Sequence, residues 1–284
     1  MKYTQRHSFD ADHYVLSRSR DEQDRLNKQH EYITEAVFDG RLIFKNNTKV
    51  RPGMKVLDSA TGTGCWILAL SKEVDSSISL VGADISSTMF PDSHPRNVQF
   101  VETSVTNMPE KWTETFDFIN QRFLIAALTA TQWAVALKEL YRVLKPGGTI
   151  QITELHSFNP VGEGLRKSGE VWKKFMSLLE EKGHLSDSGY RIKDFARNAG
   201  FENVEESVQR APIGRRWGKL GEAGAENLKR GLRVLEPANI GRGGLENVNT
   251  CTKSQSLVEC ARQEWDNCEG LYLSVTVFTA RKPL

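Results

Sequence analysis

Between residues 51 and 155, short apolar runs alternate with segments in which apolar side chains recur at helical spacing. Such runs, bounded by turn residues, are typical of buried strands, and their alternation with helices predicts a parallel sheet covered on both faces. The predicted strands span residues 55–59, 79–84, 98–103, 116–120 and 148–154. Helices are predicted at residues 65–74, shortly after residue 87, at 126–130 and at 131–143.

The stretches on either side carry weaker patterns. In residues 1–50, Leu26, Ile33 and Val37 form a sparse apolar stripe, which predicts an amphipathic helix over 21–38 that needs a partner surface. Residues 156–284 include an irregular, glycine-bearing insertion at 211–250. Their pattern predicts helices at 162–182, 192–199, 222–235 and 253–265 and strands at 204–209 and 271–279. The last strand alternates in a way that suits an antiparallel strand near a sheet edge.

Composition narrows the class of protein. The chain is 39% hydrophobic and 26% charged, a balance that supports a folded core, and we expect one globular domain. Its 38 Lys and Arg against 36 Asp and Glu leave a net charge of +2, with no basic stripe, so nucleic acid is not an expected partner. The polar start and the absence of a long apolar run predict no secretion signal and no membrane span. We therefore expect a cytoplasmic protein, with the nucleus as the alternative.

Residues 56–66, with the sequence VLDSATGTGCW, combine a buried strand, a glycine-bearing turn and the start of a helix. Glycines let a ligand approach the backbone closely, and the helix start offers free N–H groups. A dinucleotide fingerprint needs a third glycine three residues after Gly64, where this chain has Ile67. The loop therefore favours a nucleoside ligand without phosphates.

Asp84 closes the second predicted strand, 20 residues after Gly64. At this separation a carboxylate can accept hydrogen bonds from both hydroxyls of a ribose. The alternative for an aspartate at a strand end is a helix cap or a turn, but the glycine loop upstream favours the ribose.

The loop resembles motif I of the class I S-adenosylmethionine-dependent methyltransferases. The resemblance implies a Rossmann-like, seven-stranded, mostly parallel sheet with helices on both faces and an antiparallel last strand. It also implies S-adenosylmethionine as the cofactor. The cofactor contacts that it implies are Asp58, Ala60, Thr61, Gly62 and Gly64 in the loop, Asp84 and Ile85 at the ribose, Ser104 and Val105 at the adenine, and Asn120, Gln121 and Arg122 after the fourth strand.

Two positions depart from the family's pattern. Ala60 stands where the family usually has its first glycine. Because a positive φ costs alanine on the order of 1 kcal/mol, we predict a negative φ there. Ser104 stands where an aspartate usually binds the adenine amine, and its uncharged hydroxyl predicts a weaker hydrogen bond.

Residues 14–155 show a narrower resemblance to a fungal methyltransferase family, which includes the velvet-complex regulator of secondary metabolism and tailoring enzymes for small metabolites. It is carried by YVL at 14–16, Glu22, RL at 25–26, QH at 29–30, FDFI at 116–119, Arg122, KPGG at 145–148 and Glu154. It implies that the N-terminal helix folds over the cofactor and that Tyr14, Gln29 and Arg122 reach its methionine part. The alternatives are ordinary helix packing for Tyr14 and Gln29 and a structural ion pair for Arg122.

Methyl transfer from a sulfonium requires alignment of the acceptor with the methyl group in a water-poor pocket, and alignment alone can supply about 7–11 kcal/mol. It can proceed without a base when the acceptor is a thiolate, a carboxylate or a neutral amine. The candidates for acceptor contact or proton removal are Glu154 and His156, which follow the fifth strand at the ligand edge of the sheet. An ordinary hydrogen-bonded surface histidine is the alternative for His156. The histidines and cysteines have no metal-ligand spacing, so no metal is expected.

The C-terminal stretch supplies the candidates for an acceptor pocket. Apolar side chains that could form its wall, or could be core, are Trp172, Phe175, Met176, Leu178 and Leu179. The insertion offers Trp217, Leu232 and Leu235 as a lid. We therefore divide the chain into an N-terminal helical cover (1–50), a cofactor-binding core (51–155) and a C-terminal part (156–284), whose substrate lid spans about 156–190 and 211–250.

The leading hypothesis is a methyltransferase that methylates a heteroatom of a small molecule, a fungal specialised metabolite, by in-line displacement. A regulatory methyltransferase-like protein that acts through a protein partner is the second hypothesis. A chain that keeps the cofactor but catalyses a reaction without methyl transfer is the third. Redox chemistry with a nicotinamide dinucleotide ranks last, because the third glycine is missing. The sequence leaves the acceptor atom and the oligomeric state open.

Overall fold

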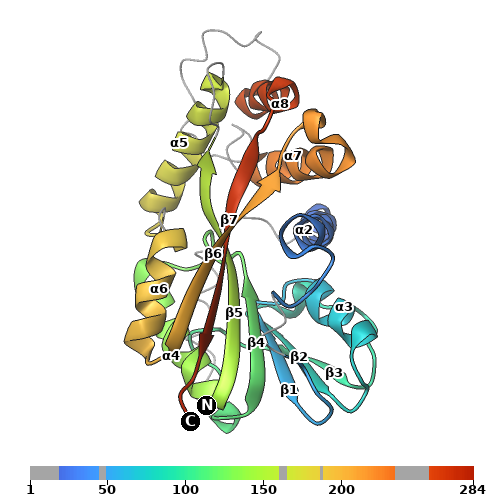
Figure 1. The fold of residues 1–284 in the computed structure, drawn as a ribbon, viewed down its shortest axis with the longest axis vertical. Coiled ribbons are helices and arrows are strands. Elements are labelled where there is room, and N and C mark those ends of the chain that lie inside the picture. The colour runs from blue at the N-terminus through green and yellow to red at the C-terminus, as the bar shows by residue number, and fades with distance from the viewer. Residues whose placement is uncertain (1–18, 45–48, 160–164, 186–187, 234–255) are drawn as a thin grey trace.

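The computed structural model describes residues 19–44, 49–159, 165–185, 188–233 and 256–284. These residues form a seven-stranded sheet with the order β3-β2-β1-β4-β5-β7-β6 (Figure 1). The strands are β1 (Lys55–Ser59), β2 (Ser79–Asp84), β3 (Val98–Glu102), β4 (Phe116–Arg122), β5 (Leu144–Asn159), β6 (Glu202–Pro212) and β7 (Tyr272–Arg281). The first five pair in parallel, and β7 runs antiparallel to both of its neighbours, β5 and β6.

Helices cover both faces of the sheet, as the alternating pattern predicts. They are α2 (Arg20–Phe38), α3 (Cys65–Glu73), α4 (Ala130–Val143), α5 (Arg166–Glu181), α6 (Ser188–Ala199), α7 (Gly218–Leu232) and α8 (Leu257–Asn267). In Figure 1, α4 and α6 lie on one side of the sheet, and α2, α3 and α7 lie on the other. In the described part of the chain, no helix is long and apolar enough to cross a membrane.

The predicted elements agree with the structure in type and order, with one exception. The helix predicted at 126–130 is wrong, because residues 124–128 form turns and Thr129 caps the start of α4. Its side chain accepts from the Gln132 N–H while the Gln132 side chain accepts from the Thr129 N–H, and this capping box fixes where the helix begins. The last strand is antiparallel as predicted, and it lies next to the edge strand β6.

The strand β5 extends well beyond its predicted end at residue 154. Its pairing with β7 continues to Asn159, across an irregularity between Leu155 and Ser157. An antiparallel partner of ten residues supplies backbone hydrogen bonds to this extension. The long β5–β7 pair therefore carries the sheet past the ends of β1 and β4, and it forms one wall of the space under α2 and α7.

Helix α2 spans almost the predicted range. Its first turn is capped by the Ser19 side chain, which accepts from the Glu22 N–H, and it ends at Asp39, which has a positive φ. The predicted stripe residues Ile33 and Val37 are buried in a cluster with residues of α7 and β7. The partner surface that this polar helix needs is therefore formed by the C-terminal part of the chain.

Helix α7 crosses α2 closely at Gly224. The Tyr32 hydroxyl donates to the Pro212 carbonyl over 2.7 Å, and the Asn227 side chain donates to the Arg25 carbonyl over 2.9 Å. A Cβ atom at Gly224 would lie 2.5 Å from the Tyr32 ring and 2.6 Å from the Pro212 oxygen. The absence of a side chain at Gly224 is therefore what allows the two helices to meet.

We predict that Gly224→Ala lowers the free energy of unfolding by about 1–3 kcal/mol, because the added methyl group forces α2 and α7 apart. Chemical denaturation measures the change. Gly169→Ala is the matched control, since it lies in α5 with open space around its Cβ position. It should raise stability by about 0.4–1 kcal/mol. A similar gain for both variants would contradict a tight crossing at Gly224.

Candidate functional site

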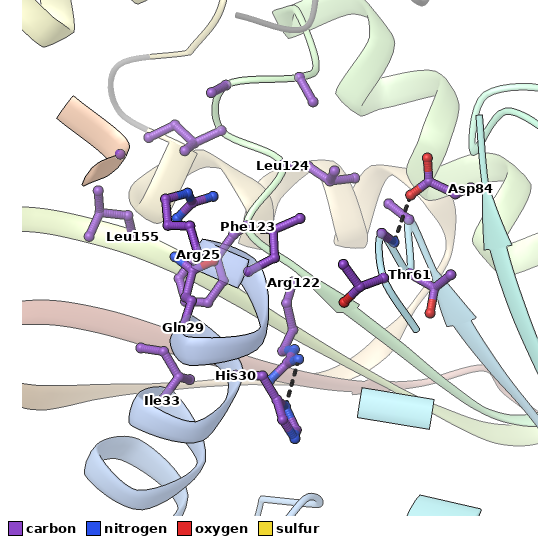
Figure 2. Close-up of a pocket in the computed structure, with 18 of the residues that line it drawn as sticks. Arg25, Gln29, His30, Ile33, Thr61, Asp84, Arg122, Phe123, Leu124 and Leu155 are labelled. Carbon is purple, nitrogen blue, oxygen red and sulfur yellow. Dashed lines mark hydrogen bonds between the residues drawn. The ribbon is translucent and has the colours of Figure 1, made fainter. Parts of the chain in front are cut away.

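A cavity of about 260 Å³ lies at the carboxyl ends of β1, β2 and β4, and α2, α5 and α7 complete its lining (Figure 2). One half is polar and is formed by the turn after β1 and by the ends of β2 and β3. The other half is apolar and is formed by the helices and by β5 and β7. The carboxyl ends of parallel strands are the usual ligand edge of such a sheet.

The turn after β1 is held by hydrogen bonds that its backbone N–H groups donate to residues of β2. The Thr61 N–H donates to the Ala83 carbonyl over 2.8 Å, and the Gly62 N–H donates to Asp84 Oδ2 over 2.8 Å. The turn also contacts α2, because the Thr63 hydroxyl donates to the side chain of Asn27 over 2.7 Å. Three predicted cofactor residues, Ala60, Thr61 and Gly62, line the cavity here.

The prediction of a negative φ for Ala60 is wrong, because its φ is +54°. The left-handed conformation costs an alanine about 1 kcal/mol, so surrounding contacts must impose it. The contacts of the next residue impose this conformation, because the Thr61 N–H donates to the Ala83 carbonyl of β2 and the Thr61 hydroxyl donates to Asp58. The chain therefore turns sharply at position 60 without the glycine that the family usually has there.

Asp58 is buried at the base of this turn. Its Oδ2 accepts from the Thr61 hydroxyl over 2.5 Å, and its Oδ1 accepts from the Asn120 side chain over 2.7 Å. Burial raises the pKa of Asp58, and the Arg122 charge and these hydrogen bonds oppose that rise. Asn120 continues the network to Gln151 on β5 over 3.0 Å. Asp58 reaches the cavity lining, whereas Asn120 lies beneath it and supports it.

Gln121 and Gly64 also lie outside the cavity lining. Gln121 is fully buried and its side-chain oxygen accepts from the Ser59 hydroxyl over 3.4 Å. Gly64 has a φ of +74° and precedes α3, and a Cβ atom there would lie 2.5 Å from the Phe100 ring. The glycine is therefore required by helix entry and by the packing of Phe100.

The ends of β2 and β3 bring four predicted residues, Asp84, Ile85, Ser104 and Val105, to one side of the cavity. Besides the bond from Gly62, Asp84 accepts a longer bond of 3.3 Å from the Ser86 N–H. A carboxylate has about four lone-pair sites, so it can accept several hydrogen bonds at once. The Ser104 hydroxyl is buried and lies 2.8 Å from the Thr106 hydroxyl, which competes for its hydrogen bonds.

Arg122 and His30 face each other across the cavity floor (Figure 2). An arginine Nη2–H donates to His30 Nδ1 over 3.1 Å. Burial, reinforced by the Arg122 charge, lowers the pKa of His30 to about 3, so the imidazole is neutral at physiological pH. Arg122 thus has a neutral hydrogen-bond partner in His30, and its positive charge, which also acts on Asp58, is suited to an anion in the cavity. Gln29 lines the cavity, and Tyr14 lies outside the described residues.

The apolar half contains part of the predicted wall. Trp172 and Phe175 of α5 line it, whereas Met176, Leu178 and Leu179 pack into the adjacent core. Of the predicted lid residues, Leu232 lines the cavity and Leu235 lies outside the described residues. Trp217 is 48% exposed, and its indole N–H donates to the Leu271 carbonyl over 2.7 Å.

Glu154 and His156, the predicted catalytic residues, are absent from the described cavity lining. Side chains alternate along a strand, and Leu155 between them is the residue that faces the cavity. On the opposite face, the Glu154 carboxylate accepts from the Leu124 N–H, and His156 hydrogen-bonds to the Thr276 hydroxyl. Glu154 therefore contacts the backbone of the cavity wall rather than the cavity itself.

Four residues that were not predicted as site residues also line the cavity: Arg25, His30, Phe123 and Asn227. Arg25 and Gln29 are four residues apart on α2, a spacing that places them on one helical face. This spacing could have identified Arg25 from the sequence. Asn227 joins the site only through the crossing of α2 and α7, which no local pattern indicates.

Burial raises the pKa of the Glu154 carboxyl to about 8, against opposing backbone hydrogen bonds. The folded protein keeps this proton while the unfolded chain loses it, so stability falls as pH rises from about 4.5 to about 8. Glu154→Gln cannot lose a proton. We predict that its unfolding free energy rises relative to that of the unmodified protein by roughly 2–4 kcal/mol from about pH 5 to about pH 8.

Denaturation at several pH values measures this difference, and Glu202→Gln, at an exposed position, is the control. A difference between Glu154→Gln and the unmodified protein that stays constant with pH would show that Glu154 is ionised in the folded state.

Comparison with known proteins identifies the family of this chain. The family model described as the ubiE/COQ5 methyltransferase family matches residues 23–206. The N-methyltransferase sirN of Leptosphaeria maculans is 30% identical, over 80% of this chain and 80% of its own. The N-methyltransferase gliN of Aspergillus fumigatus is 32% identical, over 76% of this chain and 78% of its own.

Two solved structures share the fold. Phosphoethanolamine N-methyltransferase 2 of Haemonchus contortus, in complex with S-adenosyl-L-methionine, aligns with a TM-score of 0.52 and 15% identity over 91% of this chain. This chain spans about half of that protein, 53%. A possible histamine N-methyltransferase of Thermotoga maritima aligns with a TM-score of 0.50 and 18% identity, over 95% of this chain and 99% of that chain.

The Rossmann-like fold expected from the sequence is therefore confirmed. The matched family model covers more than half of the chain, and the fungal relatives align with most of it. The chain belongs to the ubiE/COQ5 methyltransferase family and is a small-molecule methyltransferase that uses S-adenosylmethionine as its methyl donor.

Proposed function

We propose that the polar half of the cavity binds the cofactor with its ribose at Asp84 and its adenine beside Ile85, Ser104 and Val105. The methionine end then lies toward Gln29 and Arg122. The chemistry of the side chains fits this orientation, because an acceptor for two hydroxyls lies at one end and an arginine suited to a carboxylate at the other. Contacts from Tyr14 stay a prediction of the sequence.

The proposal for the acceptor rests on one observation, which is where the carboxylates of the cavity lining lie. Asp58 and Asp84 are the only carboxylates in the cavity lining that the structure describes, and both belong to the polar half. Among its described lining residues, the apolar half thus offers no anion to hold an ammonium group. His30 does not serve as a base, because its Nδ1 accepts from Arg122 and its other ring nitrogen carries the proton. In this proposal, the acceptor enters with its lone pair already free.

We infer that this acceptor is an uncharged nitrogen of an apolar small molecule. The relatives sirN and gliN are N-methyltransferases by name, which supports nitrogen over oxygen or sulfur. The bound cofactor supplies an electrophilic methyl group on its sulfonium. The contribution of the chain is to align the acceptor and to exclude water, and the side chains of Phe123, Trp172 and Phe175 are suited to both tasks.

Helices α5 and α7 are proposed to act as the substrate lid, since each contributes lining residues to the apolar half. Glu154 is proposed to position the wall through the Leu124 backbone. Its buried place on the opposite face argues against contact with the acceptor. A concave apolar half lined by Trp172, Phe175 and Leu232 favours a small molecule over a protein substrate. The cytoplasmic location stays a prediction.

The test incubates the protein with methyl-labelled S-adenosylmethionine and an extract of fungal small molecules. We expect label to appear on a small apolar compound, and NMR of the product to show an N-methyl group. Trp172→Ala should raise the KM for that compound with little change in cofactor affinity, because Trp172 lies in the apolar half. Ser177→Ala, at an exposed position on the same helix, is the control.

Cofactor binding without transfer of label to any compound would contradict catalysis on small molecules. Label on oxygen, sulfur or carbon would contradict the proposed acceptor nitrogen.

A further inference from the structure

An arginine and a glutamate are buried together where α2 meets the cavity. Arg25 is 5% exposed and Glu22 is 7% exposed. The guanidinium donates twice to the carboxylate, from Nε to Oε2 over 2.7 Å and from Nη2 to Oε1 over 2.6 Å. Burying two charges carries a desolvation penalty that such a pair recovers only in part, so stability alone is a weak reason for its presence.

One amino group of this arginine remains available. Arg25 Nη1 makes no hydrogen bond to any described residue. Among the described residues, it is also not one of the side-chain polar atoms that are completely buried without a hydrogen-bond partner. Arg25 lines the cavity, and Figure 2 shows its side chain among the other lining residues. The Nη1 group therefore presents free N–H donors to the cavity.

The neighbouring helix keeps this donor accessible. Gly231 of α7 lies opposite Nη1, and a Cβ atom at this glycine would be 3.8 Å from it. A larger side chain at position 231 would extend toward the guanidinium. Asn227, one turn earlier, binds the Arg25 carbonyl over 2.9 Å and holds the two helices in register. The donor is thus fixed in direction, with an apolar wall that includes Leu155 and Leu232 in the same cavity.

The charge of the pair determines what this donor can bind. Glu22 neutralises Arg25, so the pair attracts an anion much less than a lone arginine would. A guanidinium only donates hydrogen bonds, so its partner must be an acceptor. A carbonyl oxygen meets both conditions, because it is uncharged and has no hydrogen of its own to be satisfied.

We propose that Arg25 Nη1 donates a hydrogen bond to a carbonyl oxygen of the acceptor molecule and so determines substrate specificity. The proposal rests on the function proposed above, in which the apolar half binds an uncharged acceptor. It assigns Arg25 to the acceptor and Arg122 to the cofactor. An acceptor molecule that carries a carbonyl group is then bound in one orientation, with its nitrogen directed by the Arg25 contact.

The test uses three small probes of similar shape on the protein saturated with S-adenosylhomocysteine. Acetophenone carries a carbonyl oxygen, α-methylstyrene replaces it with a methylene group, and benzoate replaces the acetyl group with a carboxylate. Ligand-observed NMR titration measures the three affinities. We expect acetophenone to bind on the order of tenfold more tightly than α-methylstyrene, the size of one hydrogen bond to a charged donor. Benzoate should bind no more tightly than acetophenone.

Two variants connect this preference to the pair. Glu22→Gln/Arg25→Met removes both charges together and should abolish the preference for acetophenone over α-methylstyrene. Glu22→Gln alone leaves Arg25 with an unbalanced charge and should shift the preference toward benzoate. Arg230→Met is the control, because Arg230 binds Asp24 between the same two helices without lining the cavity. Circular dichroism and thermal denaturation show that each variant is folded, independently of its S-adenosylhomocysteine affinity.

A preference for acetophenone that survives in the double variant would overturn the proposal, as would no detectable binding of acetophenone. A tenfold loss of S-adenosylhomocysteine affinity in the folded double variant would assign Arg25 to the cofactor instead. These measurements need no methyl transfer. The proposed methylation and the role of Arg25 can therefore fail separately.

Discussion

The hydrogen bond from the Gly62 N–H to the Asp84 carboxylate joins the ends of two adjacent parallel strands, and the cavity depends on it. With the bond from Thr61 to the Ala83 carbonyl, it folds the turn after β1 back over β2. The turn can do this only with positive φ at Ala60, Gly62 and Gly64. The carboxylate that holds the loop in this way also lines the polar half of the cavity, so in the proposed cofactor orientation Asp84 both shapes the loop and binds the ribose.

The buried charged residues of the site differ in the charge and the hydrogen-bond donors that remain available after their contacts with neighbouring residues. Asp58 is surrounded by donors from Thr61 and Asn120 and acts on the shape of the turn. Arg122 is bound to a neutral imidazole and keeps its positive charge for an anion. Arg25 is neutralised by Glu22 but keeps free N–H donors. The cavity therefore has one end suited to an anionic carboxylate and another suited to an uncharged acceptor.

The parallel strands were predictable from the sequence because their apolar runs are buried on both faces. The ranges predicted for β1 and β2 agree with the structure at both ends. The negative φ predicted for Ala60 was wrong because the prediction considered only the intrinsic preference of alanine. Hydrogen bonds from Thr61 to β2 and to Asp58 outweigh that preference.

The two candidate catalytic residues show a second limit of prediction from the sequence. Glu154 and His156 lie within β5 rather than after its end, and the face of the strand that each occupies was not predictable from the sequence. A strand covered on both faces has no polar side to mark its orientation. The polar contacts at the crossing of α2 and α7 could also not be predicted from the sequence, because Asn227 and Arg25 are 202 residues apart in the chain. The residues of the polar half could thus be predicted from local motifs, whereas those of the apolar half depend on how the helices pack.

The most direct test of this account is the affinity of Asp84→Ala for S-adenosylmethionine, measured by calorimetry beside Asp84→Asn. The asparagine can still accept from the Gly62 N–H, so it separates the shape of the turn from the binding of ribose. Asp75→Ala, in the exposed turn before β2, is the control. The account predicts a loss of affinity of at least roughly tenfold for Asp84→Ala, because charge-assisted hydrogen bonds to the ribose disappear. Unchanged affinity in a folded Asp84→Ala variant would contradict the placement of the nucleoside.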